Sequence, residues 1–314
     1  MNLKKLKKLS GDASFRNFYR SKNSIIVYCI KNKKSNLLDY DAINKILIKK
    51  KVIAPSLISQ HYKENYIEIE DFGDLTVFEK FKNNKTNKKN YYKKILDLLS
   101  KIKKIKIKKQ KTFLKTNFKV PNYTSKMLLD ESNLFIDWYL QKYFKGKKKR
   151  SIEKELKIIF KKLLRNISYK RKVFVHRDFH VSNIMITKRG LGLIDSQDAA
   201  YGNIAYDLAS LIDDVRLKTN IKIKDFIFHE FLKKNKNLDH KKFKNDFDIL
   251  SVLRNFKIIG IFTRLSMRDN KNKYLKLIPY AWKLIELRTS KNPIFKDLNY
   301  LLAKNFDKKK RKLI

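Results

Sequence analysis

The chain of 314 residues has little of three things: cysteine, acidic residues and long apolar runs. Its one cysteine, Cys29, cannot form a disulfide within the chain, so a reducing, cytoplasmic location is expected. No stretch approaches the roughly 18 to 20 consecutive apolar residues that a membrane-spanning helix needs. The basic N-terminal segment MNLKKLKKLSGDAS is not followed by the apolar region of a signal peptide. The sequence therefore predicts no membrane segment and no export.

Acidic residues number 30 against 76 lysines and arginines, which gives a formal net charge of +46. Such a charge is typical of proteins that bind nucleic acids or anionic membranes. The lysines are, however, spread along the whole chain instead of being gathered in one arm. This distribution favours a different explanation, in which drift of an A/T-rich coding sequence has filled solvent-facing positions with lysine. We therefore do not expect nucleic acid as a partner, although the basic surface should modestly attract polyanionic nucleotides.

The chain also lacks internal repeats and any linker rich in proline, glycine or serine. Its first 75 residues predict a strand at 24–30 (SIIVYCI), a helix at 37–48 and a strand at 65–74 (NYIEIEDFGD), with Pro55 turning the chain between the last two. Strand, helix and strand in this order indicate a small mixed lobe.

From residue 76 the pattern is mainly helical. Amphipathic spacing predicts a helix at 151–164 with Ser151 as its N-cap, and a helix at 124–144 in which Glu131 lies among apolar residues. Glu131 is either a carboxylate that faces a substrate or a helix charge paired with a neighbour. Further helices are predicted at 91–105, 205–216, 223–234, 244–268 and 274–288.

The helical part is interrupted once, at 173–195, by three short β-branched segments: VFVH, NIMI and LGLID. Polar residues lie at or just beyond the ends of these segments: Asp178, then Asn183 five positions later, then Asp195 after twelve more. Phosphoryl transfer needs a carboxylate that accepts the proton of the attacking hydroxyl and two oxygen ligands for Mg²⁺. These three side chains supply that set. Turn propensity explains each residue singly but not the three together.

A metal site made of His176, Asp178 and His180 is a weaker alternative, because no second pair of ligands is nearby. Both histidines are instead expected to brace the loop.

The segment HRDFHVSN resembles the catalytic loop of the aminoglycoside phosphotransferase and choline kinase superfamily, which shares the protein-kinase-like fold. Within it, the sequence is most similar to the anomeric N-acetylmuramate/N-acetylglucosamine kinases of bacterial cell-wall recycling. The resemblance implies an α+β bilobal fold, with a nucleotide-binding lobe at 1–72 built on an antiparallel sheet and a mainly helical catalytic and substrate-binding lobe at 73–314. The likeness runs nearly end to end, through 11–20 (GDASFRNFYR), 69–74 (IEDFGD), 135–140 (FIDWYL), 194–216 and 255–279.

The same resemblance implies ATP and Mg²⁺ as cofactors, Asp178 as the catalytic base and Asn183 and Asp195 as the Mg²⁺ ligands. It makes Asp207 a buried carboxylate that supports the catalytic loop. The resemblance also implies two groups of nucleotide-binding residues. The first approaches the phosphates through backbone N–H groups and consists of Gly11, Asp12, Ala13 and Ser14. The second presents backbone groups to adenine and consists of Glu70, Asp71 and Phe72.

Two departures from the kinase pattern narrow the function. Tyr28 and Cys29 stand where kinases carry a phosphate-binding lysine, so Arg16 and Lys31 are the candidates for this cation. Asp195 is followed by Ser-Gln-Asp instead of Phe-Gly, and no Ala-Pro-Glu closes an activation segment. We therefore expect a small acceptor and not a protein.

The expected partners are ATP and a small hydroxyl-bearing acceptor, in the first place an amino sugar. Gln197, Asp198 and Asp213 are candidate acceptor contacts, because polar side chains just past the metal-binding aspartate should face the acceptor; Glu131 is a fourth.

Two alternatives remain open. A kinase for choline, ethanolamine or an aminoglycoside would need an acidic, aromatic pocket, which Trp138 with Asp130, Glu131 and Asp137 could form. A basic nucleic-acid-binding protein on a degenerate kinase fold would show steeply salt-dependent binding and no phosphoryl transfer.

Overall fold

The computed structural model of the chain describes residues 6–9, 16–82 and 86–312. Its internal contacts divide the chain into two units, which we call unit 1 (1–122 with 173–201) and unit 2 (123–172 with 202–314). The segment that carries Asp178, Asn183 and Asp195 therefore belongs to the same unit as the N-terminal sheet. The predicted lobes, 1–72 and 73–314, follow a different division and stay a prediction.

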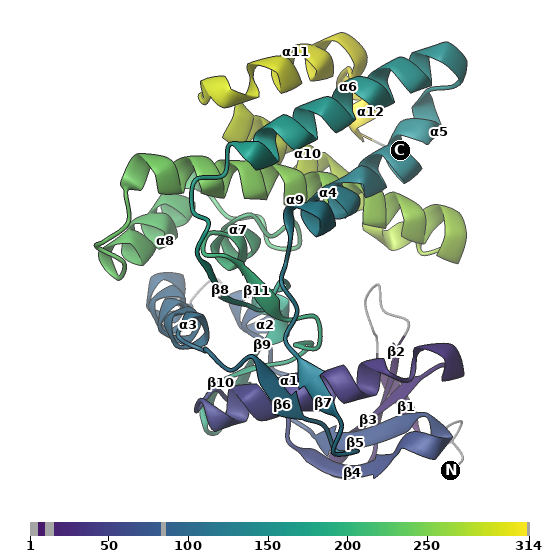
Figure 1. Cartoon of the computed structure of the whole chain (residues 1–314), viewed down its shortest axis with the longest axis vertical. Coiled ribbons are helices and arrows are strands. Elements are labelled where there is room, and N and C mark those ends of the chain that lie inside the picture. Colours follow the sequence, from purple (N-terminus) through teal and green to yellow (C-terminus); the bar gives the residue numbers. More distant parts are fainter. Residues whose placement is uncertain (1–5, 10–15, 83–85, 313–314) are drawn as a thin grey trace. The chain divides into compact units, whose positions relative to one another are not determined.

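Unit 1 contains a five-stranded antiparallel sheet in the order β1-β2-β3-β5-β4 (Figure 1). In its centre Phe18 pairs with Val27, which pairs with Ile67, and both aliphatic residues are fully buried. The predicted strands at 24–30 and 65–74 are confirmed, although the second ends at Glu70. The strands are β1 (Lys7–Leu9), β2 (Arg16–Arg20), β3 (Ser24–Cys29), β4 (Leu57–His61) and β5 (Tyr66–Glu70).

Helix α1 (Asn36–Lys49) packs on this sheet, as predicted for 37–48. Leu37 and Tyr40 of the helix share a core cluster with Cys29 of β3. Burial raises the pKa of the Cys29 thiol to about 11, although the positive charge of Arg16 opposes this shift. The cysteine is therefore a neutral core residue. Short 3-10 turns, η2 (Lys31–Lys33) and η3 (Tyr62–Glu64), connect these elements.

The rest of unit 1 consists of two helices and short strand pairs. Strands β9 and β10 form an antiparallel hairpin, whereas β8 pairs with β11, so the three short strands predicted in 173–195 are present but belong to two sheets. The elements are α2 (Val77–Lys82), α3 (Lys88–Lys103), β6 (Lys109–Lys111), β7 (Asn117–Lys119), β8 (Lys172–Val175), η5 (Val181–Asn183), β9 (Ile184–Thr187), β10 (Gly190–Leu193) and β11 (Ala200–Asn203).

Unit 2 is helical and is built around the long helix α9, which contacts α4, α7, α10, η4 and η6 (Figure 1). Its core includes Phe135, Tyr139, Phe256, Trp282 and Phe306, whose rings pack on one another. The elements are α4 (Ser125–Leu134), the π-helical η4 (Phe135–Leu140), α5 (Gln141–Tyr143), α6 (Gly146–Arg165), α7 (Tyr206–Ile212), α8 (Ile221–Lys233), α9 (His240–Asp269), η6 (Asn272–Leu277), α10 (Ile278–Thr289), η7 (Pro293–Phe295), α11 (Lys296–Asn305) and α12 (Lys308–Lys312).

The helices predicted in this unit are present, but α6 begins earlier than expected. Its N-cap position is Lys145, so the prediction that Ser151 caps this helix is wrong. Ser151 lies in the second turn, where its hydroxyl donates to Glu155 (3.1 Å). The lysines before Ser151 are good helix formers, and they extend the helix toward the N-terminus.

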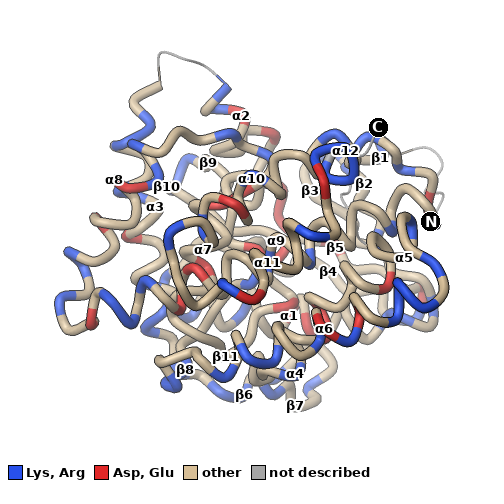
Figure 2. Tube along the Cα trace, turned by 90° about the horizontal axis from the view of Figure 1, so that it is seen from above, with Lys and Arg blue, Asp and Glu red and all other residues tan. Residues whose placement is uncertain are grey.

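Lysine and arginine occur along the elements of both units (Figure 2). Of the helices in the described part of the chain, none has the length and apolarity that crossing a bilayer requires.

Gly260 of α9 allows a close backbone approach at the junction where α4 passes into the π-helical η4. A Cβ atom on this residue would lie 2.3 Å from the carbonyl carbon of Leu134 and 2.5 Å from the nitrogen of Phe135. Because of these short distances, position 260 must have no side chain. The junction itself is notable because π-helical turns are uncommon and often occur at functional sites.

We expect Gly260→Ala to lower the free energy of unfolding by about 2 kcal/mol or more, because overpacking against backbone atoms outweighs the gain of about 1 kcal/mol in helix propensity. Urea unfolding would measure this change. Met267→Ala, at a half-exposed position of the same helix, is the control and should change stability little. A Gly260→Ala protein as stable as the parent would contradict this packing argument.

Candidate active site

The hairpin of β9 and β10 brings Asn183 and Asp195 together. Its register pairs Ile184 with Leu193, and the next residues continue this pairing, because the Ile194 N–H donates to the Asn183 carbonyl (3.1 Å). Asn183 and Asp195 therefore stand at the same end of the hairpin. Twelve residues of sequence separation become adjacency in the fold.

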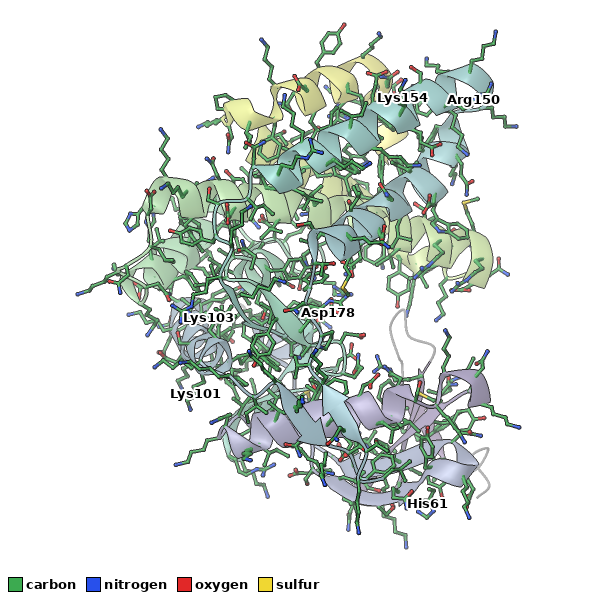
Figure 3. All side chains as sticks on the ribbon, viewed as in Figure 1. His61, Lys101, Lys103, Arg150, Lys154 and Asp178 are labelled. Atoms are coloured by element: carbon green, nitrogen blue, oxygen red, sulfur yellow. The ribbon has the colours of Figure 1, made fainter. Side chains whose placement is uncertain are left out.

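The loop before β9 is closed by hydrogen bonds to Asp178. The carbonyl of Asp178 accepts from the Asn183 side-chain amide (3.0 Å) and from the His180 N–H (3.0 Å). The Asn183 N–H in turn donates to the His180 carbonyl (2.9 Å). Asp178 itself, which is labelled in Figure 3, has a half-buried side chain. The three predicted residues thus form one local group.

One residue of this group and one residue next to it have left-handed backbone: Asp195, with φ of 61°, and Arg177, with φ of 73°. This conformation is unfavourable for residues with a Cβ atom, although aspartate tolerates it better than most. Strained positions that the surrounding structure maintains are often found at functional sites. One such residue directly precedes Asp178 and the other is Asp195 itself.

Arg16 of β2 contacts Asp195 directly. Its guanidinium lies 3.0 Å from the Asp195 carboxylate and also donates to Asn36 (3.2 Å), and only 5% of its side chain is exposed. Lys31, the other predicted phosphate cation, is exposed in η2. The structure therefore brings Arg16 to the predicted metal ligand, while the loop Gly11–Ser14 lies outside the described residues.

The pKa of Asp195 is raised, chiefly by burial and further by the nearby carboxylates of Asp178 and Asp198. Arg16 opposes this shift. The side chain is still 37% exposed, so one face of the carboxylate is open to solvent or a ligand. Asp195 therefore lies in the field of two further carboxylates, which the positive charge of Arg16 opposes.

Three residues of α1 support this segment and were not predicted from the sequence. The Tyr40 hydroxyl is hydrogen-bonded to the backbone of Asp195, and Ser196 donates to Asn44 (2.5 Å). Together with Asn36 they recur at four-residue steps and so occupy one face of the helix. The polar positions in an otherwise apolar helix face were the available signal.

His176 and His180 are buried in the loop, and their bracing role stays a prediction. The imidazole Nε2 of His176 lies 3.1 Å from the Ile194 carbonyl, and that of His180 lies 3.4 Å from the Asn183 amide. Within residues 6–9, 16–82 and 86–312, no three His, Cys, Asp or Glu side chains are placed to hold a metal ion. The alternative site of His176, Asp178 and His180 therefore has no support.

The predicted adenine-binding segment follows β5. Glu70 is paired with Arg189 and accepts from Ser56 (3.1 Å), and Asp71 is paired with Arg20 (2.6 Å). The ring of Phe72 lies against Gly192 of β10, where an added Cβ would be 2.9 Å from it.

These contacts tie the segment to β10, the strand that leads to Asp195. All predicted nucleotide and metal residues in the described part belong to unit 1.

Gln197 and Asp198 follow Asp195 in unit 1. Gln197 is buried, and its side-chain amide donates to Asp198 (2.7 Å). The carbonyl oxygen of the same side chain is buried with no hydrogen-bond partner among the described residues. Asp198 is exposed.

Glu131 and Asp207 belong to unit 2. The Glu131 carboxylate lies 2.9 Å from the Lys257 ammonium and accepts from the Tyr123 hydroxyl, which favours the paired-charge interpretation. Asp207 is buried in the first turn of α7, as predicted; its support of the catalytic loop stays a prediction.

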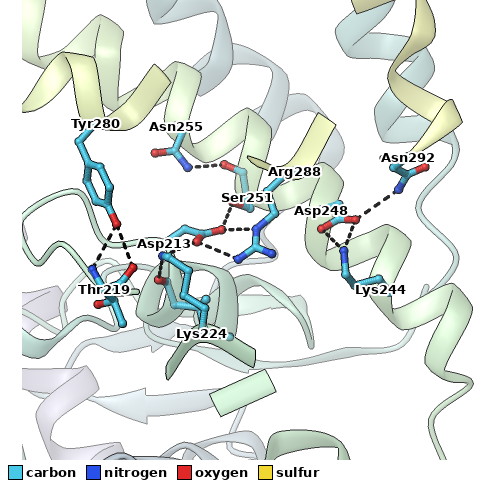
Figure 4. Close-up of polar contacts among 11 residues, drawn as sticks. Asp213, Thr219, Lys224, Lys244, Asp248, Ser251, Asn255, Tyr280, Arg288 and Asn292 are labelled. Atoms are coloured by element: carbon cyan, nitrogen blue, oxygen red, sulfur yellow. Dashed lines mark hydrogen bonds and ion pairs between the residues drawn. The ribbon is translucent and has the colours of Figure 1, made fainter. Parts of the chain in front are cut away.

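Asp213 of unit 2 is the centre of a buried ionic cluster (Figure 4). Its two oxygens accept from the Arg288 guanidinium (2.8 and 3.0 Å), the Lys224 ammonium (2.8 Å) and the Ser251 hydroxyl (2.6 Å). Burial alone would raise the pKa of this carboxyl, but the charges of Lys224 and Arg288 outweigh burial and hold the pKa well below its usual range. With four donors at its oxygens, Asp213 has a stabilising role, and nothing in these contacts supports the predicted acceptor contact.

The sequence matches the phosphotransferase enzyme family over residues 5–225, and the chain belongs to this family. The chain is similar to an N-acetylmuramate/N-acetylglucosamine kinase of Pseudomonas aeruginosa, with 25% identity over 94% of the chain and 86% of that protein. A kinase of the same name from Neisseria meningitidis is 34% identical over 51% of the chain and 50% of its own length. The predicted resemblance is confirmed.

Among solved structures, a choline/ethanolamine kinase family protein of Mesorhizobium loti superposes with a TM-score of 0.61 and 12% identity, covering 95% of this chain and 92% of its own. An ADP-bound aminoglycoside phosphotransferase superposes with a TM-score of 0.60 and 15% identity, covering 91% and 93%. These likenesses confirm the predicted α+β protein-kinase-like fold.

We expect Asp213→Asn to lower the free energy of unfolding at pH 7 by about 3 to 5 kcal/mol, because it leaves two buried cations without their counter-charge. A carboxyl whose pKa is depressed in the folded state contributes its stability above the unfolded pKa, near 4, and loses it as the pH falls below that value. The difference between the two proteins should therefore shrink between pH 5 and pH 3 in urea unfolding.

Asp297→Asn is the matched control, since Asp297 forms an exposed pair with Lys162 (2.7 Å). It should have little effect at either pH. A loss for Asp213→Asn that is unchanged at pH 3 would show that the side chain acts by shape and not by charge.

Proposed function

We propose that this chain is an ATP- and Mg²⁺-dependent kinase that transfers the γ-phosphoryl group to a sugar hydroxyl, most specifically the anomeric hydroxyl of N-acetylmuramate or N-acetylglucosamine. The observation that carries the proposal is the local group of Asp178, Asn183 and Asp195 at one end of the β9–β10 hairpin. The names of the curated relatives supply the acceptor class.

In the proposed reaction the Asp178 carboxylate accepts the proton of the acceptor hydroxyl. The hydroxyl oxygen forms a bond to the γ-phosphorus, and the bond from this phosphorus to the bridging oxygen of ADP breaks. Asp178 is suited to this role because its loop is fixed by hydrogen bonds within the 178–183 segment. Positioning and electrostatics are expected to provide most of the acceleration in phosphoryl transfer.

Asn183 and Asp195 carry oxygen atoms, which are the ligands that Mg²⁺ prefers. The Asn183 Nδ2 group donates to the Asp178 carbonyl, which leaves its amide oxygen as an acceptor, and the Asp195 carboxylate is partly exposed. One amide oxygen and one carboxylate, with phosphate oxygens, suffice for this ion. Bound there, Mg²⁺ would neutralise charge on the phosphates.

Arg16 is the proposed phosphate cation of this chain, since it is the buried base that contacts Asp195. Glu70, Asp71 and Phe72 are proposed to present backbone groups to adenine. The turn Gly11–Ser14, which lies outside the described residues, is proposed to bind the phosphates.

Gln197 supports an acceptor rich in hydroxyl groups. Its buried carbonyl oxygen has no donor in the described part of the chain, and an unsatisfied buried acceptor is unfavourable by roughly 1 to 3 kcal/mol. A sugar hydroxyl would supply the missing donor. Asp198, beside it, is a second proposed contact.

A kinase for choline, ethanolamine or an aminoglycoside is the second candidate, because structural neighbours carry these names. Such an acceptor is cationic and would need unpaired acidic side chains. Glu131, the central acid of the predicted pocket, is paired with Lys257. The amino-sugar acceptor is therefore favoured.

Nucleic acid binding on an inactive kinase fold is less well supported. The basic residues are spread over both units (Figure 2) and the Asp178, Asn183 and Asp195 group is complete.

Asp178→Asn should lower the turnover number by about 10²- to 10⁴-fold, because it removes the proton acceptor, while ATP binding stays largely intact. Steady-state kinetics and a nucleotide-binding titration would measure the two effects. Asp307→Asn, which changes an exposed aspartate in the same way, should keep normal turnover. Near-normal turnover of Asp178→Asn would refute the proposed role.

An acceptor panel with labelled ATP tests the substrate class. N-acetylmuramate and N-acetylglucosamine should be phosphorylated, and the product should lose its reducing end if the anomeric hydroxyl is the acceptor. Choline, ethanolamine and kanamycin should give no product above background. Phosphorylation of a cationic acceptor alone would favour the second candidate, and salt-dependent RNA binding without any product would favour the third.

A further inference from the structure

A pocket of about 240 Å³ in unit 1 lies apart from the residues assigned above to phosphoryl transfer. Its wall is formed by one face of α3, by the chain just after α1 and by the turn between β9 and β10. Lys94, Asp97, Leu98 and Lys101 recur at three- and four-residue steps, so they occupy that face of α3 together. Figure 3 shows Lys101 on this helix.

The pocket is strongly basic. Lys51, Lys94, Lys101 and Arg189 line it, against one carboxylate, Asp97. The three lysines are exposed, and none of them forms an ion pair within the part of the chain that the structure describes. The four basic side chains and Asp97 together carry a charge of +3, of which the Arg189 charge is paired with Glu70.

Part of the pocket lining is apolar, because Ile53, Leu98 and Leu191 contribute to it. An inorganic ion would leave this surface uncovered, whereas an organic phosphate could place carbon atoms against it. An arginine fork with flexible lysine ammonium groups matches the oxygens of a phosphate dianion. The volume limits the ligand to a small molecule.

Arg189 connects this pocket with the segment after β5. Its guanidinium is paired with Glu70 and lies over the Phe72 ring, 5.6 Å from the ring centre. The side chain is 57% exposed, so it is free to rotate toward an anion. A bound phosphate would compete with Glu70 for the same guanidinium.

We propose that this pocket binds a small organic phosphate, held by Lys51, Lys94, Lys101 and Arg189, and that the ligand draws Arg189 away from Glu70. The segment Glu70–Phe72 then loses one of its restraints. If this segment binds adenine, which rests on the proposed function above, nucleotide affinity falls when the pocket is filled, and by reciprocity nucleotide weakens phosphate binding.

Glycerol 3-phosphate is the probe for the first test, with ¹⁵N-labelled protein and neither nucleotide nor acceptor present. The backbone amide signals of Gly190 and Leu191 should shift and saturate. The double variant Lys94→Gln/Lys101→Gln should weaken this binding by about tenfold or more, because charge-assisted hydrogen bonds are lost.

The matched control is Arg150→Gln/Lys154→Gln, which removes the same charge from exposed positions of α6 (Figure 3). It should leave the affinity nearly unchanged. Shifts that do not saturate, or an equal loss in both double variants, would overturn the site, because either result describes general attraction to a basic surface. An inactive enzyme would not affect this test, since no phosphoryl transfer is involved.

The role of Arg189 has its own test. Glu70→Gln releases Arg189 from its ion pair and should tighten glycerol 3-phosphate binding by up to about fivefold. Glu79→Gln, which removes the same charge from an exposed pair with Lys82, should have little effect. Equal changes in these two variants, or no change in either, would overturn the competition between Glu70 and the ligand.

Discussion

The backbone pairing of β9 with β10 is the constraint on which the candidate site depends. It continues one step beyond the strands, through the bond from the Ile194 N–H to the Asn183 carbonyl, and so sets the metal-binding candidates side by side. A shift of register by one residue would turn every side chain of the shifted strand to the opposite face. Strand β10 is hydrogen-bonded to the chain after α1, since the Leu193 N–H donates to the Ile53 carbonyl (2.8 Å). The ring of Phe72 packs against Gly192 of the same strand. The hairpin thus links the N-terminal sheet to the candidate catalytic residues.

The charges around Asp195 are the second feature of the candidate site. Burial is the main cause that raises the pKa of Asp195, and the nearby charges of Asp178 and Asp198 raise it further. The positive charge of Arg16 offsets these effects only in part. A cluster of this kind gains from a divalent cation, because positive charge removes the repulsion between the carboxylates. The fold maintains the cluster at the expense of two left-handed residues, Arg177 and Asp195. Strain and repulsion at one place are easier to explain by ligand binding than by stability alone.

The group of Asp178, Asn183 and Asp195 could be predicted from the sequence because these residues are close together in the chain. Only short strands between them were needed to bring their side chains together. The supports from α1 could not be predicted, since the four-residue step of Asn36, Tyr40 and Asn44 does not say which segment they face. Strands β1, β2 and β4 were missed because edge and near-edge strands need no apolar run. Asp213 was assigned to the acceptor from its nearness in sequence, and its cations come from helices 11 and 75 positions away.

Acceptor recognition is the part of the function that the family fold leaves open, because solved structures of this fold carry names of enzymes with very different acceptors. A cation and a sugar make opposite demands: the first needs uncompensated carboxylates, the second needs acceptors and donors for hydroxyl groups. In this chain Glu131 and Asp213 are neutralised by basic partners within unit 2. Gln197, two residues past Asp195, keeps a buried oxygen that still lacks a donor. A buried amide oxygen can accept from a hydroxyl or from an N–H group, so the proposed preference for a neutral or anionic sugar over a cationic acceptor rests on the neutralised carboxylates of unit 2.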